Sequence, residues 1–167
     1  GWDNNVTVVH QTKKTLNVYK TSLFTWLRDE NYASAAIGAA VLSVCDLHIE
    51  YILTTGTNIS VSANTLERLD EDFQLWTDIF SDYTMYMNNP TQLLTSSLPW
   101  KHIITSLSID TRHMIDFVQK ELYYSFGIYT IKVWLVIMLI RGESKAVIDG
   151  LLSSIISEWV PKPCTPA

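Results

Sequence analysis

The side chains that could do chemistry in this sequence are few in kind and scattered in position. The four histidines, His10, His48, His102 and His113, lie far apart and show no spacing that is typical of a metal site. The sequence contains no His-Glu-x-x-His, Cys-x-x-Cys or Gly-x-Ser-x-Gly motif. Serines are numerous, but no spacing assigns a general base to any of them. We therefore predict that the protein is not an enzyme and binds no metal or cofactor.

Aromatic side chains point instead to recognition of another protein. The sequence has six tryptophans and eight tyrosines, and Trp, Tyr and Arg carry much of the binding energy at protein interfaces. Trp76 and Trp134 fall on apolar helix faces and are predicted to lie in the core. Trp100 falls near a predicted helix start and is predicted to be an exposed anchor for a partner.

Cysteines and sequons favour an extracellular protein. The two cysteines are Cys45 and Cys164, and Cys164 lies in a proline-rich tail that has no other anchor. Two Asn-x-Ser/Thr sequons, at Asn5 and Asn58, lie next to predicted helix ends, where a glycan could be accommodated. We predict a secreted protein with a Cys45–Cys164 disulfide and glycans at both asparagines. The alternative is an intracellular protein with two free thiols and unmodified sequons.

Composition argues against nucleic acid and membrane as partners. Lys and Arg number 12 against 17 Asp and Glu, which gives a net charge of −5, and no basic cluster occurs. The most apolar run, Ile131–Ile140, contains Lys132 and is shorter than the roughly 20 residues that span a bilayer, so we predict no membrane span. Hydrophobic residues still make up 47% of the 167 residues. Much apolar surface must therefore be covered within the fold or by a partner.

Apolar periodicity predicts an all-α fold. The clearest pattern places apolar residues at steps of three and four from Leu66 through Phe73 and Phe80 to Met87. We predict a single bundle domain of four or five long helices over residues 1–160, and a tail at 161–167 that Cys164 ties to the fold. The predicted helices are at about 6–29, 33–53, 64–88, 98–122 and 128–159.

The last of these helices is predicted to organise the bundle. Its first half, Ile131–Ile140, is apolar all round, and at 1.5 Å per residue the whole helix would be roughly 45 Å long. The preceding helix is predicted to start near Ser97 and Pro99, because Ser caps helices and Pro is favoured in their first turn. The segment 33–53 is less regular, and either a helix or an irregular crossover fits it.

The order of these elements resembles a long-chain four-helix cytokine of the interleukin-6 and interleukin-12 alpha-chain group. The most local similarity is at Tyr129-Thr-Ile-Lys132-Val-Trp134. Members of that group that bind the leukaemia-inhibitory-factor receptor carry Phe-x-x-Lys at the start of their last helix, often with a tryptophan two residues on. Tyr129 replaces the Phe here, and Lys132 matches the Lys. The resemblance implies that Tyr129 and Lys132, with Trp100, contact a signalling receptor.

Two features depart from that family. The connection from residue 122 to 128 is short where the family has a long crossover, and 33–53 has a helical pattern where the family's first crossover is irregular. A five-helix bundle therefore competes with the cytokine fold. The main functional alternative is a secreted carrier of fatty acids or other apolar ligands, with a cavity inside the bundle. A binding module of no recognisable family is a third possibility.

Overall fold

The computed structural model describes residues 11–15, 30–56 and 61–159, and these residues are almost entirely helical. The prediction of an all-α bundle is confirmed, and no strand occurs within the described ranges. The first predicted helix, at 6–29, is described only over residues 11–15, which are helical. The tail at 161–167 lies outside the described residues.

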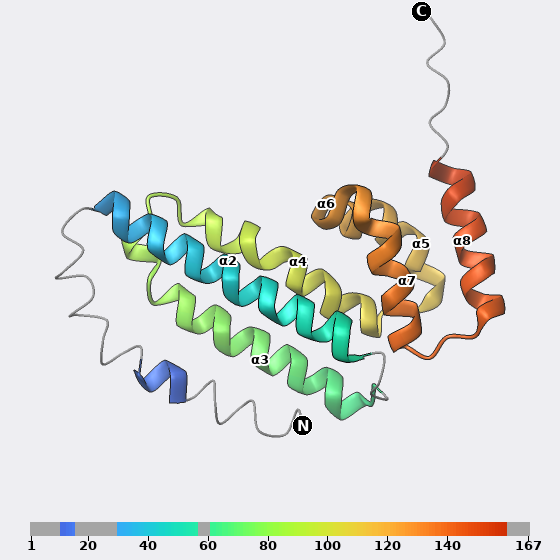
Figure 1. Cartoon of the computed structure of the whole chain (residues 1–167), viewed down its shortest axis with the longest axis horizontal. Helices are drawn as coiled ribbons and strands as arrows, with labels where there is room; N and C mark the ends of the chain where they lie inside the picture. The colour runs from blue at the N-terminus through green and yellow to red at the C-terminus, as the bar shows by residue number, and fades with distance from the viewer. Residues whose placement is uncertain (1–10, 16–29, 57–60, 160–167) are drawn as a thin grey trace, which may run out of the picture.

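Three long helices, α2 (Glu30–Thr55), α3 (Ala63–Ser81) and α4 (Thr91–Ser108), lie side by side and form a three-helix layer (Figure 1). Short connections join them, so consecutive helices run in opposite directions. Segment 33–53 is therefore helix and not crossover. Helix α3 begins where its sequence pattern begins, and the Ser62 hydroxyl accepts a 3.2 Å hydrogen bond from the Thr65 N–H as its N-cap. It ends before residue 88, and a 3₁₀ turn at Thr84–Tyr86 follows.

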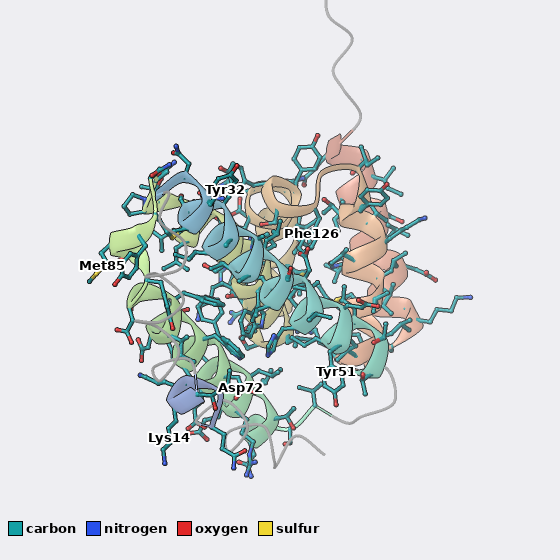
Figure 2. The ribbon with its side chains drawn as sticks, turned by 60° about the vertical axis from the view of Figure 1, so that its left-hand side comes forward. Lys14, Tyr32, Tyr51, Asp72, Met85 and Phe126 are labelled. Carbon is teal, nitrogen blue, oxygen red and sulfur yellow. The ribbon has the colours of Figure 1, made fainter. Side chains whose placement is uncertain are left out.

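The turn between α3 and α4 lies beside the start of α2. Tyr32 on α2 and Met85 in the turn mark this end of the layer (Figure 2). The Asn88 backbone N–H donates to the Ser34 hydroxyl at 3.0 Å, and the Asn88 side chain donates to Asn31 at 3.0 Å. These bonds fix the end of α3 to α2.

The central helix is α4, and not the last helix as predicted. It packs against α2 and α3 on one side and against α6 and α7 on the other. The predicted helix at 98–122 is wrong at both ends, because α4 begins at Thr91 and is broken by extended backbone at Ile109 and Asp110. Pro99 lies inside α4 and not in its first turn. Burial of α4 between neighbours on both sides outweighs the hydrogen bond that a proline removes from a helix interior.

After Asp110 the chain forms a segmented C-terminal arm, here defined as residues 111–159, at one end of the layer (Figure 1). The arm consists of a 3₁₀ turn (Thr111–His113), α5 (Met114–Phe117), a π-helical turn η5 (Val118–Leu122), α6 (Tyr123–Phe126), a 3₁₀ turn η6 (Gly127–Tyr129), α7 (Thr130–Ile140) and α8 (Lys145–Trp159). Helix α8 packs on α5, and its Ile155 is completely buried.

The single predicted helix at 128–159 is wrong, because α7 ends at Ile140 and the chain turns before α8. Gly142 has a φ of 70°, which favours glycine. The Gly142 N–H donates to the Leu139 carbonyl at 3.0 Å, and the Glu143 N–H donates to the Met138 carbonyl at 3.1 Å. This pair of bonds is a Schellman motif, which ends a helix at a left-handed glycine.

Arg141 ties this turn to the end of α4. Its Nη1 donates to the carbonyls of Ser106, at 3.0 Å, and Ile109, at 2.6 Å. Its Nη2 also pairs with the Glu143 carboxylate at 3.1 Å. A cation at the C-terminal end of α4 satisfies carbonyls that have no donor within the helix. The break between α7 and α8 is thereby held against the central helix.

Candidate functional site

The turn between α6 and α7 carries the residues that the cytokine resemblance singled out. Gly127, with a φ of 52°, ends α6 and reverses the chain. The buried Thr130 hydroxyl donates to the Gly127 carbonyl at 2.6 Å and holds the first turn of α7 in place. Tyr129 is 60% exposed and Ile128 is 86% exposed, and Lys132 is also exposed one turn along α7. These three residues define the turn surface: Ile128, Tyr129 and Lys132.

Trp100 does not belong to this surface, and the prediction that it is an exposed anchor is wrong. Its side chain is 1% exposed. The ring stacks on His48 of α2, with centroids 4.2 Å apart, and meets the edge of Phe73 of α3 at 5.1 Å. The misplaced helix start explains the error, because Trp100 lies in the middle of α4 where both neighbours cover it. Trp134 is completely buried, as predicted.

Half-buried His48 and buried Asp72 are the polar side chains near Trp100 on the neighbouring helices α2 and α3. His48 Nδ1 lies 2.8 Å from the Val44 carbonyl, and the imidazole meets Trp76 edge-on with centroids 6.0 Å apart. Asp72 on α3 (labelled in Figure 2) is only 4% exposed, and its Oδ1 has no hydrogen-bond partner among the described residues. Burial raises the pKa of the Asp72 carboxyl above its ordinary value, while the charge of His48 opposes that rise.

The predicted disulfide is not formed. Cys45 is a free thiol on α2 and its side chain is completely buried. Burial, with a smaller contribution from the charge of Asp46, raises the pKa of this thiol to about 12. Cys45 fills a core position of the layer as a small apolar side chain would. Cys164 lies outside the described residues, and so do both sequon asparagines, Asn5 and Asn58.

An apolar groove of about 420 Å³ opens between α4, α3 and α6. It is lined by Phe73, Leu94, Thr95, Ser97, Leu98, Lys101 and Tyr124. Lys101 is the charged residue of this lining. Its ammonium pairs with the Asp70 carboxylate at 2.6 Å and lies 5.1 Å from the centre of the Phe73 ring. The carrier hypothesis predicted a cavity inside the bundle, whereas this groove lies at the junction of the layer and the arm.

Three polar side chains, His102, Ser125 and Glu121, interact near the groove, and the sequence did not indicate this contact. The Nδ1 of His102, on α4, lies 2.7 Å from the Ser125 hydroxyl on α6. Its Nε2 lies 3.3 Å from the Glu121 carboxylate in η5. His102 is buried, and its burial lowers the pKa of the imidazole, with the Glu121 charge acting in the opposite direction. Because 23 residues separate His102 from Ser125, no local spacing could have revealed the pair.

Comparisons with known proteins return nothing: no family model, curated protein or solved structure matches this chain. Within the described ranges, no group of three or more His, Cys, Asp and Glu side chains could hold a metal ion.

Two helical stretches, Asn31–Thr55 and Thr111–Ile140, are long and apolar enough to cross a membrane, judged by length and composition alone. Each contains an 18-residue window of mean hydropathy 1.6, of which 28% is buried. Mostly buried core helices of soluble proteins and signal sequences pass the same test, so these two stretches are weak evidence for a membrane span. The absence of a membrane span stays a prediction.

Proposed function

We propose that the protein acts by binding another protein through the turn surface. The observation that carries this proposal is the exposure of Ile128 and Tyr129 at a turn whose backbone is held by Gly127 and Thr130. Exposed apolar and aromatic side chains on a rigid support are typical of interface hot spots. The cytokine resemblance selects Tyr129 and Lys132 of this surface as receptor contacts, and a cell-surface receptor is the partner it implies.

The chemistry of the turn surface defines the partner that would fit. Ile128 and Tyr129 require an apolar pocket, and Tyr129 adds a hydroxyl at the tip of its ring. Lys132, one turn along α7, requires an acidic group at the edge of that pocket. We therefore propose a partner that presents a carboxylate beside an apolar depression.

A protein partner suits this surface better than a bilayer. The chain has a net charge of −5 and no basic cluster, so the electrostatic attraction that anionic lipids exert on peripheral proteins is missing. The stretch Thr111–Ile140 is also broken at Gly127, where φ is 52°. An intact helix of about 20 residues is the ordinary way to cross the bilayer.

The test compares four proteins for binding to cells that display cytokine-class receptors and to phosphatidylcholine vesicles. The proteins are the wild type, Tyr129→Ala, Lys132→Glu and the control Lys145→Glu, which changes an exposed lysine at the start of α8. We expect wild type and Lys145→Glu to bind cells, and Tyr129→Ala and Lys132→Glu to lose about 30-fold in affinity, as for a hot spot of about 2 kcal/mol. Unchanged binding by both turn variants would refute the turn surface. Binding to vesicles by all four proteins would make the membrane the partner.

The groove supports a second candidate function, the carriage of an apolar ligand. Its volume of about 420 Å³ lies within the usual range for small-molecule sites, and Lys101 could pair with a fatty-acid carboxylate in place of Asp70. Titration of the protein with decanoic acid tests this function. Phe73 lines the groove and contacts Trp100, so binding should change tryptophan fluorescence, and Leu94→Trp should reduce the affinity by filling the groove. A native mass that never exceeds that of the bare chain would argue against a carrier.

A further inference from the structure

We propose that Ser125, His102 and Glu121 form a nucleophilic site that hydrolyses esters of apolar acyl chains, with the adjoining groove as the acyl-binding site. From the sequence we predicted no enzyme, because no spacing assigned a general base to any serine. In the fold, His102 of α4 lies beside Ser125 of α6 and can act as that base. This proposal does not depend on the turn surface or on any protein partner.

The geometry gives each of the three side chains a separate role. A nucleophile, a base within hydrogen-bonding reach and a third group that orients the base are the signature of activated serine nucleophiles on unrelated folds. Here the Ser125 hydroxyl lies 2.7 Å from His102 Nδ1, and Glu121 lies 3.3 Å from Nε2. The Glu121 carboxylate can only accept a hydrogen bond when ionised, so it selects the tautomer with a proton on Nε2. Nδ1 is then free to accept the Ser125 proton.

The surroundings keep His102 neutral and fixed. The imidazole is 6% exposed, and the Phe117 ring meets it edge-on with centroids 5.9 Å apart. Burial of the ring disfavours the imidazolium in the resting protein and lowers the pKa of His102, which leaves the base form available. Glu121 stabilises the positive charge that forms on the ring once it has taken a proton. Glu121 is therefore a positioning residue, whereas Ser125 and His102 are catalytic residues.

The groove supplies the substrate class. Ser125 follows Tyr124 in α6, and His102 lies one turn beyond Leu98 and next to Lys101 in α4, and all three of these neighbours line the groove. Leu98 and His102 are four residues apart and share a face of α4, so the pair lies next to the groove without lining it. The apolar lining, which includes Phe73, Leu94 and Leu98, suits a linear acyl chain.

The reaction balances with water as the second reactant. The Ser125 oxygen attacks the ester carbonyl carbon while its proton moves to His102 Nδ1. The bond from the carbonyl carbon to the alkoxy oxygen then breaks, and the alcohol leaves with the proton from His102. Water attacks the acyl-Ser125 ester by the same route, gives its proton to His102, and releases the fatty acid as the proton returns to the Ser125 oxygen.

The first experiment uses a fluorophosphonate probe, which reacts covalently with activated serines, on the folded full-length chain. The proteins are wild type, Ser125→Ala, His102→Gln and the control Ser108→Ala, which removes an exposed hydroxyl from the same helix as His102. We expect the probe on Ser125 in wild type and Ser108→Ala, located by peptide mass spectrometry. We expect no labelling of Ser125→Ala and at least about a 100-fold slower rate for His102→Gln, as for loss of a general base. Circular dichroism melting of each variant establishes that it is folded.

The second experiment measures hydrolysis of p-nitrophenyl octanoate and p-nitrophenyl acetate. Leu94→Trp, at an exposed groove position, should raise KM for the octanoate and leave the acetate unchanged. Glu121→Gln should lower kcat on both esters while KM stays the same, because the group orients the base and does not touch the substrate. A folded wild type that carries no probe on Ser125, or a Ser125→Ala variant that hydrolyses both esters at the wild-type rate, overturns the proposal.

Discussion

The three-helix layer and the C-terminal arm use similar aromatic residues for opposite purposes. In the layer, Trp100 is enclosed by His48 and Phe73 from two other helices. In the arm, Tyr124 and Tyr129 are 73% and 60% exposed on short helical segments. Trp100 lies where three helices meet, whereas the turn at Gly127 leaves Ile128 and Tyr129 uncovered. Aromatic content alone therefore does not separate residues that stabilise the fold from residues that could recognise a partner.

The largest expected difference between the two regions is in the free energy of unfolding after removal of an aromatic ring. Trp100→Ala should lower it by about 3–5 kcal/mol, because the neighbours of a buried ring cannot fill the space. Tyr129→Ala should change it by no more than about 0.5 kcal/mol, as is usual at the surface. Urea denaturation of both variants measures the contrast. Equal losses would mean that the turn surface is part of the core.

A smaller change in the free energy of unfolding is expected when either of two glycines of the arm is replaced by alanine. A Cβ meets no atom within 4 Å at either Gly142 or Gly150, so the two positions differ only in backbone conformation. Gly142→Ala should destabilise by about 1–2 kcal/mol, because its φ of 70° disfavours a Cβ. Gly150 lies inside α8, so Gly150→Ala should raise the free energy of unfolding by about 0.5–1 kcal/mol. Thermal melts of the pair that shift in the same direction would contradict the helix end at Gly142.

Asp72 in the layer should make stability depend on pH. Burial raises the pKa of its carboxyl in the folded state, so folding favours the protonated form, and the associated stability is lost as the pH rises through the folded pKa. Asp72→Asn keeps the shape without the charge. It should therefore be more stable than wild type at pH 7. This advantage should shrink as the pH falls through the folded pKa and stop changing below about pH 4, where aspartates are protonated in the unfolded chain as well.

Denaturant titrations at several pH values measure this difference. Asp78→Asn, an exposed change on the same helix, is the matched control for the replacement of Asp by Asn. An Asp72→Asn variant that is less stable than wild type at pH 7 would mean that the carboxylate has a partner that stabilises its charge.

The smallest expected effect concerns Cys45, which should not react with a thiol reagent in the native protein. The thiol is completely buried and its pKa is raised to about 12, so it should not react with Ellman's reagent in the native protein at pH 8. In denaturant without a reductant, both cysteines should react if neither forms a disulfide. If neither cysteine reacts in denaturant but two thiols appear after reduction, the Cys45–Cys164 disulfide is present and Cys45 is not a free thiol.

The parts of the fold that the sequence predicted are those with an uninterrupted apolar stripe. Helix α3 follows its stripe from Leu66 through Phe73 to Phe80, and the all-α class was predicted as well. The segment of α2, in contrast, was left open between a helix and an irregular crossover. The errors occur where a local preference competes with burial. Pro99 and Ser97 indicate a helix start, yet packing carries α4 through both of them. The apolar run at Ile131–Ile140 favours a continuous helix, yet the Gly142 Schellman motif ends it.

The candidate sites divide in the same way. Tyr129 and Lys132 were selected from a four-residue motif, and both are exposed at the start of α7, because residues three apart share a helix face. Trp100 was selected for the same surface but lies in the core. The Ser125, His102 and Glu121 chain and the groove beside it could not be foreseen, because they join residues of α4 to residues of η5 and α6.

The sequence by itself determined the helical class, the position of the strongest amphipathic helices and the residues available for recognition. Those properties follow from the period of the α-helix and from side-chain chemistry, both of which are local. The tertiary structure decided that α4 is the central helix and that Trp100 and Cys45 are buried. It also decided that Ser125 lies within hydrogen-bonding distance of His102. Each of these depends on which helices pack together, and burial by a distant segment has no signature in the neighbouring residues.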